Sequence, residues 1–194
     1  MSINPIRLEG NWEEGFAIDF HVIKSVYTGE NEYGRSEFIT TRSVIGELVY
    51  QLKYQFKEDK VYDIIKLISP FLNNWEVIEK VDVVIPVPPT NKTRAFQPVF
   101  LISEKIAEFL NKPIALNLLE KVDLHEMKNL TIEEKTKKIG GSIIKHKNFL
   151  RSVNVLLVDD LYKSGTTLNE ACIVLRKDKN VDNIYVLAMT KTKG

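Results

Sequence analysis

Apolar side chains alternate with polar or small ones from residue 15 to residue 22. A repeat of two residues is typical of a strand with one buried face. Residues 28–34 have the composition of a turn, and a second strand-like run follows at 36–41. The two runs and the turn between them predict a β-hairpin.

The apolar period lengthens between residues 42 and 56, where large aliphatic residues recur every three or four positions, as on one face of a helix. A second helical face follows at 61–68. Asp59 is placed to cap the start of that second helix, and Pro70 is placed to end it. The hairpin and the helix pair together predict a hood-like N-terminal extension, residues 1–78.

The second half of the chain contains apolar runs of a different kind. The runs at 82–85 and 153–158 are typical of strands buried on both faces, as in the centre of a parallel sheet. Helical spacing follows each of them, and shorter apolar segments predict strands at 114–119, 142–145 and 183–188. This order predicts an α/β core, residues 79–194, with a mainly parallel sheet flanked by helices.

Composition narrows the classes of function. A net charge of +1 over 194 residues argues against a broad nucleic-acid-binding surface, though not against a local basic patch. The single cysteine, Cys172, excludes an internal disulfide and a cysteine-rich zinc site. No apolar stretch reaches membrane length, and no apolar run follows a basic start. We therefore expect a cytoplasmic protein without a membrane partner.

Two carboxylates, Asp159 and Asp160, stand where the 153–158 strand is expected to end, just before a helical pattern. Ligands of open α/β sheets bind outside the carboxyl ends of the strands. The loop between the carboxylates and the helix offers backbone N–H groups, hydroxyls and the positive end of a helix dipole, which suit a phosphate. That loop consists of Lys163, Ser164, Gly165, Thr166 and Thr167.

Carboxylates beside a phosphate loop suit the vicinal hydroxyls of a sugar or a hard cation such as Mg²⁺. Asp159, Asp160 and the loop at 163–167 together therefore predict a ribose phosphate site. An alternative stays open, in which the aspartates cap the helix and the loop is an ordinary strand-to-helix turn.

The stretch from Leu157 to Leu168 resembles the phosphoribosyl pyrophosphate (PRPP) binding signature of the type I phosphoribosyltransferases. The matching residues are Asp159, Asp160, Leu161, Ser164, Gly165 and Thr167, whereas Tyr162 and Lys163 depart from the pattern. The resemblance implies a type I phosphoribosyltransferase-like fold. It also implies that Asp159 and Asp160 are the catalytic pair and hold Mg²⁺, partly through the ribose hydroxyls.

The resemblance extends to the ComF family of competence-associated, phosphoribosyltransferase-like proteins. It is carried by Leu52-Lys53-Tyr54, by Ile85-Pro86-Val87-Pro88 with Arg94-Ala95-Phe96, and by Met127 to Thr131 with Lys135 and Gly141. By this resemblance the loop 89–96 would contact pyrophosphate, and Lys92 and Arg94 are the side chains expected there, with solvated loop charges as the alternative. The polar, lysine-rich segment 121–141 is a candidate lid. Departures from the family pattern fall at Ala95, Gln97-Pro98, Met127, Lys135 and Lys138, and the chain has no four-cysteine zinc module.

Three functions follow as expectations. The first is a transferase of nucleotide metabolism that binds PRPP with Mg²⁺ and passes the phosphoribosyl group to an unidentified base. The second is a PRPP or nucleotide sensor without turnover, which the departures favour. The third, implied by the family resemblance, is an accessory protein of DNA uptake that works with a competence helicase or single-stranded DNA. A homodimer is also compatible with the sequence.

Overall fold

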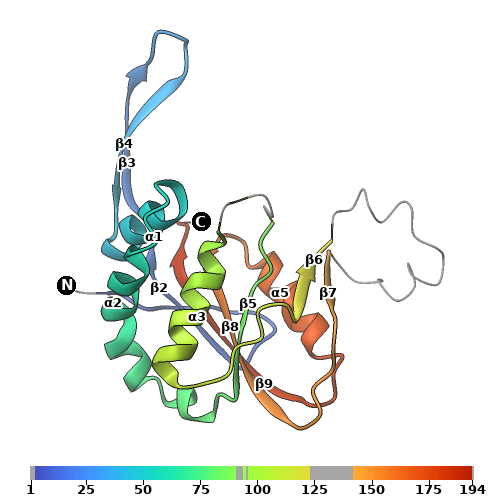
Figure 1. Ribbon diagram of the computed structural model, residues 1–194. Helices are drawn as coiled ribbons and strands as arrows, with labels where there is room; N and C mark the ends of the chain where they lie inside the picture. The colour runs from blue at the N-terminus through green and yellow to red at the C-terminus, as the bar shows by residue number, and fades with distance from the viewer. Residues whose placement is uncertain (1–2, 91–93, 95, 123–141, 194) are drawn as a thin grey trace, which may run out of the picture.

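The computed structural model describes residues 3–90, 94, 96–122 and 142–193. Its centre is a five-stranded sheet in the order β1-β2-β9-β8-β5 (Figure 1). Strands β2, β9, β8 and β5 are parallel, and β1 joins the edge of the sheet antiparallel to β2. The strands are β1 Ile6–Arg7, β2 Glu14–Phe20, β5 Val83–Pro86, β8 Val153–Tyr162 and β9 Val181–Lys191.

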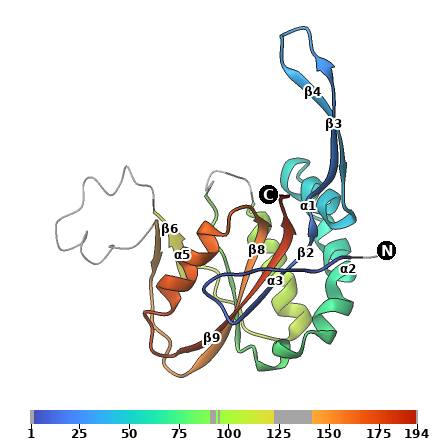
Figure 2. The same cartoon turned by 180° about the vertical axis from the view of Figure 1, so that it is seen from behind.

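Helices cover both faces of this sheet (Figures 1 and 2). Side chains of β8 point alternately to the two faces, as in any strand. Val155 and Leu157 pack in the core that includes α5, whereas Leu156 and Val158 pack in the core that includes α1, α2 and α3. The helices are α1 Val44–Tyr54, α2 Lys60–Asn74, α3 Pro98–Leu110 and α5 Thr166–Leu175. The predicted α/β class, a mainly parallel sheet flanked by helices, is confirmed.

The N-terminal hairpin forms from different residues than the sequence predicts. The alternating run at 15–22 corresponds to β2, which pairs in parallel with β9, so that Phe16 lies opposite Leu187. The hairpin consists of β3, Val22–Glu30, and β4, Ser36–Arg42, and it projects from the sheet as an arm (Figures 1 and 2). The predicted first strand of the hairpin is wrong, because the partner of β2 comes from the far end of the chain. The hairpin itself and its second strand, predicted at 36–41, are confirmed.

Helix α2 continues through Pro70 and ends at Asn74, so the predicted end of this helix is also wrong. Proline has no N–H to donate to the carbonyl of Lys66. The hydroxyl of Ser69 donates to that carbonyl instead, at 3.1 Å, and Asn74 Nδ2 donates to the Pro70 carbonyl at 2.7 Å. Asp59 holds the N-cap position but makes no side-chain capping bond.

Smaller elements complete the described chain. A 3-10 helix, Glu76–Lys80, connects α2 to β5. Strands β6, Leu119–Lys121, and β7, Ile143–Lys145, form a separate antiparallel pair. The strand expected at 114–119 is reduced to a single parallel bridge between Ile114 and Val84, followed by β6. Because β2 lies in the main sheet, residues 1–78 contribute to that sheet as well as to the arm; the division of the chain at residue 78 stays a prediction.

Candidate functional site

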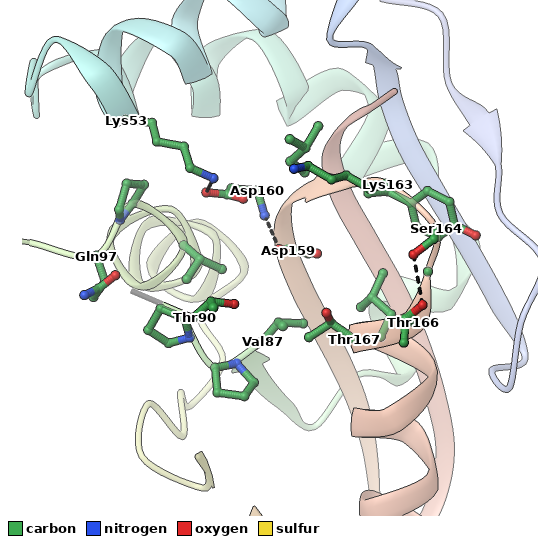
Figure 3. Close-up of a pocket in the computed structure, with 18 of the residues that line it drawn as sticks. Lys53, Val87, Thr90, Gln97, Asp159, Asp160, Lys163, Ser164, Thr166 and Thr167 are labelled. Carbon is green, nitrogen blue, oxygen red and sulfur yellow. Dashed lines mark hydrogen bonds and ion pairs between the residues drawn. The ribbon is translucent and has the colours of Figure 1, made fainter. Parts of the chain in front are cut away.

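A cavity of about 330 Å³ lies at the carboxyl ends of β5 and β8 (Figure 3). Asp159, Asp160, Arg94 and the loop 163–167, which were predicted to belong to one site, all line this cavity. Lys92, predicted for the same site, lies outside the described residues, as does most of the proposed lid. The cavity is lined by residues 53–54, 87–90, 94, 97–99 and 159–168.

The aspartate pair lies within β8 rather than after it. The strand continues to Tyr162, because β9 is long enough to pair with it as far as Lys191. The hydroxyl of Thr190 also donates to the backbone carbonyl of Asp160, at 3.1 Å. The predicted strand end before Asp159 is therefore wrong, and the two carboxylates are held on a paired strand rather than on a loop.

The loop after β8 turns at Gly165, which has a φ of +76° and is the N-cap of α5. A Cβ atom at this position would lie 2.6 Å from the hydroxyl oxygen of Tyr162. Glycine is therefore favoured here both by its positive φ and by the lack of space. The loop leads into a ten-residue helix, and its free N–H groups and the helix dipole make this end suited to an anion.

Lys53 reaches into the cavity from α1 and forms an ion pair with Asp160 (Figure 3). Its Nζ lies 2.6 Å from Asp160 Oδ2, and the two side chains are 16% and 13% exposed. In the sequence, Lys53 belongs to the Leu52-Lys53-Tyr54 motif of the family resemblance, and no site role was predicted for it. Helical periodicity places Lys53 beside the buried face of α1, but it does not tell which strand that face meets.

Asp159 sits in an unfavourable place for a negative charge. Burial, and then the neighbouring charge of Asp160, raise the pKa of its carboxyl to about 7. The N–H of Asp160 donates to Asp159 Oδ1 at 2.8 Å and, with the charge of Lys53, limits this rise. The aspartate pair therefore has one member paired with a cation and one that gains or loses a proton near neutral pH.

His21 directly follows the last residue of β2 and lies close enough to Asp160 to feel its charge. Its Nδ1 is 3.2 Å from the hydroxyl of Thr190, which in turn donates to the Asp160 carbonyl. Burial, followed by the charges of Arg42 and Lys53, lowers the pKa of His21. A neutral imidazole in this place adds no positive charge beside Lys53.

Tyr54 of α1 and Arg94 line the cavity, and further aromatic and cationic side chains pack beside Tyr54. The guanidinium of Arg94 lies 5.9 Å from the ring centre of Tyr54, which is 52% exposed. Tyr54 is next to Tyr50, at 5.3 Å between ring centres, and Arg42 lies 3.6 Å from the Tyr50 ring. Contacts of this kind hold a guanidinium in place without neutralising it. Arg94 is thus a cation at the mouth of the cavity.

Tyr162 and Lys121 also contribute to this region. Tyr162 is partly buried and packs against the core on the α5 side of the sheet, while its hydroxyl approaches Gly165. Lys121, at the start of the polar segment, donates to the hydroxyl of Thr90 at 3.3 Å. Thr90 lines the cavity, so one lysine of that segment contacts a residue of the cavity wall.

The donor atoms suit Mg²⁺ only if a ligand supplies the rest of the coordination shell. Among the residues the structure describes, no three acidic, histidine or cysteine side chains cluster as they would around a metal. The cavity does offer the carboxylate oxygens of Asp159 and Asp160. Magnesium is commonly bound by one or two carboxylates together with water and substrate phosphates, and the aspartate pair fits that pattern.

Fold and site together define an α/β protein whose cavity, at the carboxyl edge of a parallel sheet, combines a carboxylate pair with a helix N-terminus and cations. No protein-family model matches the chain, and no curated protein sequence matches it. In the part of the chain that the structure describes, no helix has the length and apolar character needed to cross a membrane.

Several solved structures share parts of the fold. Leishmania donovani UMP synthase matches with 14% identity and a TM-score of 0.41, over 86% of this chain and 28% of its own length. Adenine phosphoribosyltransferase from Thermoanaerobacter pseudethanolicus matches with 13% identity and a TM-score of 0.44, over 86% and 95%. Orotate phosphoribosyltransferase from Aeropyrum pernix matches with 15% identity and a TM-score of 0.40, over 89% and 78%. Identities and TM-scores this low do not assign an activity to this chain.

Proposed function

We propose that the chain binds PRPP, or a closely related ribose phosphate, together with Mg²⁺, and that it transfers the phosphoribosyl group to a base. One observation carries the proposal: Asp159 and Asp160 line the same cavity as the N-terminal loop of α5. Vicinal hydroxyls need acceptor-only carboxylates, and a phosphate needs N–H donors. A ribose phosphate carries both groups a few ångströms apart.

Each part of such a ligand has a counterpart in the cavity. The 5-phosphate would lie on the loop 163–167 and the ribose diol on the aspartates. The diphosphate would extend toward Thr90 and Arg94, which also line the cavity. Mg²⁺, held by Asp159 and Asp160 or through the ribose hydroxyls, would neutralise charge on the diphosphate.

The chain need not supply a covalent nucleophile for this reaction. Phosphoribosyl transfer passes through a ribose with oxocarbenium character, so positioning and charge stabilisation lower the barrier. The aspartates would hold the sugar and support its developing positive charge. Arg94, whose guanidinium lies 5.9 Å from the Tyr54 ring centre, would stabilise the departing pyrophosphate.

A sensor without turnover is the second candidate. The departures at Ala95, Gln97 and Pro98 fall beside Arg94, in the segment that would hold the pyrophosphate. A cavity that keeps sugar and phosphate recognition but has a weakened leaving-group loop would bind PRPP without reacting. The DNA-uptake role, with a helicase or single-stranded DNA as partner, stays a prediction of the family resemblance.

Thermal unfolding with PRPP, with and without Mg²⁺, tests the binding. We expect PRPP to raise the unfolding temperature more with Mg²⁺ than without it, because the charge of the diphosphate must be neutralised. The dissociation constant should fall between about 1 μM and 1 mM, the usual range for enzyme substrates. No stabilisation at millimolar PRPP and Mg²⁺ would contradict the proposal.

Pyrophosphate release in the presence of a panel of purine and pyrimidine bases then separates the two candidates. Release that depends on one of the bases identifies a transferase and its acceptor. Binding of PRPP with no release for any base supports the sensor.

A further inference from the structure

The ion pair between Lys53 and Asp160 joins two elements that are distant in sequence. Lys53 belongs to the last turn of α1, and Asp160 lies 107 residues away in β8. The buried side chains of Val49 and Leu52 anchor α1 against the sheet. Lys53 is therefore held over Asp160 by the packing of its helix, and it is not a mobile surface lysine.

A second ion pair in the molecule shows what a purely structural pair looks like. Lys145 and Asp178 are 6% and 2% exposed, and Asp178 also accepts hydrogen bonds from the N–H groups of Phe149 and Asn180. Asp178 is thus fully engaged inside the protein. Within the described part of the chain, Lys53 is the one side chain that donates to the Asp160 carboxylate, and both residues line the cavity. The pair at Asp160 belongs to a ligand site.

An ammonium at this distance competes with any cation for the same carboxylate. A divalent ion on Asp159 and Asp160 would meet the positive charge of Lys53, which already donates to Oδ2. The two like charges would repel each other across a half-buried space, where screening by water is weak. A metal ion that arrives with a diphosphate brings negative charge with it and does not suffer this penalty.

We propose that Lys53 is a built-in counter-ion that prevents the ligand-free site from binding a divalent cation, so that the metal enters only as a complex with the anionic ligand. Lys53 is thus a specificity-determining residue that selects a metal–ligand complex over the metal alone. The inference rests on the proposed function only for the identity of that ligand.

The test measures binding of Mn²⁺, a paramagnetic stand-in for Mg²⁺, to the protein in the absence of any ligand. Electron paramagnetic resonance reports free Mn²⁺ directly and requires no activity. We expect no site-specific binding by the parent protein at micromolar Mn²⁺. Lys53→Met keeps the length of the aliphatic stem and removes the charge, and it should raise the affinity for Mn²⁺ about tenfold or more. Lys53→Arg keeps the charge and should behave like the parent.

Two controls locate the effect. The double variant Lys53→Met/Asp160→Asn should lose the gained affinity, because the gained site uses Asp160. Lys60→Met makes the same change of charge at a partly exposed lysine that also faces two carboxylates, those of Asp59 and Asp63. It lies outside the cavity lining and should leave Mn²⁺ binding unchanged.

Either of two results overturns the inference: the ligand-free parent protein binds Mn²⁺ on the aspartate pair, or a folded Lys53→Met protein gains no affinity. If Lys53→Met does not fold, as judged by circular dichroism, Lys53→Gln and the parent measurement decide by the same criteria. Failure of PRPP binding would leave the Mn²⁺ result unchanged, so the inference and the proposed function can fail separately.

Discussion

Gly165 determines how closely the loop after β8 can fold onto Tyr162. Its φ of +76° is costly for any residue with a Cβ, and that Cβ would lie only 2.6 Å from the Tyr162 hydroxyl. The N–H groups that follow Gly165 are the proposed phosphate donors, so their position depends on this one residue. A substitution of Gly165 therefore tests the role of the loop in phosphate binding without changing a charge.

Gly165→Ala should destabilise the protein by about 1–2 kcal/mol, through the strained φ and the clash with Tyr162. It should also weaken the binding of PRPP and of inorganic phosphate alike, because both would use the same N–H groups. Tyr162→Phe removes the hydroxyl, and the double variant should recover part of the loss. Chemical denaturation and calorimetry measure the two effects; strictly additive losses in the double variant would contradict the proposed contact.

At the level of elements, the buried pair of Lys145 and Asp178 ties β7 to the turn after α5. Burial alone would raise the pKa of the Asp178 carboxyl, but hydrogen bonds from Lys145 and from the N–H groups of Phe149 and Asn180 lower it overall. A carboxyl whose pKa is lower in the folded than in the unfolded protein stabilises the fold above the unfolded pKa. That contribution is lost as the pH falls through the folded pKa.

Asp178→Asn should therefore lower the unfolding temperature most at neutral pH, and the difference from the parent should shrink below about pH 4. Lys145→Met should cost about 3–5 kcal/mol at neutral pH, because it leaves a buried carboxylate without its partner. Thermal unfolding from pH 3 to pH 7 measures both effects. A difference that stays constant over that range would show that folding does not change the pKa of the Asp178 carboxyl.

The sequence predicts some elements better than others, for physical reasons. The run 153–158 has only one stable environment, a strand covered on both faces, and β8 occupies it. The run 15–22 is equally strand-like, but its pattern does not identify its partner, and β9 proved to be that partner instead of the next run in sequence. Pro70 was expected to end α2 because the compensating hydroxyl of Ser69 cannot be read from propensity.

The residues of the candidate site also differ in how well the sequence predicts them. The aspartate pair and the loop 163–167 are contiguous in sequence, so their proximity could be predicted. Lys53 reaches them only because α1 packs on the sheet face that Leu156 and Val158 share. A contact across 107 residues depends on the whole topology, and a local pattern cannot reveal it.

At the scale of the whole molecule, the N-terminal segment and the C-terminal strands share one core. Ile18, Val49 and Ile64 pack in the same cluster as Leu156 and Leu187. The chain should therefore unfold as one cooperative unit, although the sequence predicted a separate extension for residues 1–78.

A fragment of residues 79–194 provides the test of that unity. It would expose the face of β8 and β9 that α1 and α2 cover, and it would lack β2 at the edge of β9. We expect it to lose the cooperative thermal transition of the full chain, because apolar burial supplies most of the stability of a domain. A fragment with a sharp transition near that of the full chain would show instead that residues 79–194 form an independent domain.

We propose that separate groups of the cavity recognise the sugar and the phosphate, and a comparison of two ligands on two variants distinguishes these roles. Titration calorimetry of PRPP with Mg²⁺, and of inorganic phosphate, is to be run on the parent, Asp159→Asn and Asp160→Asn proteins after circular dichroism has verified their folds. Each substitution keeps the shape of the side chain but replaces a carboxylate acceptor with an amide, and a hydrogen bond to a charged acceptor is worth about 1.5–3 kcal/mol.

Both variants should bind PRPP roughly tenfold to a hundredfold more weakly than the parent and bind phosphate unchanged, because the proposed phosphate donors are backbone N–H groups of the loop 163–167. If both bind PRPP as tightly as the parent, the carboxylates do not hold the ribose and the account of the site is wrong.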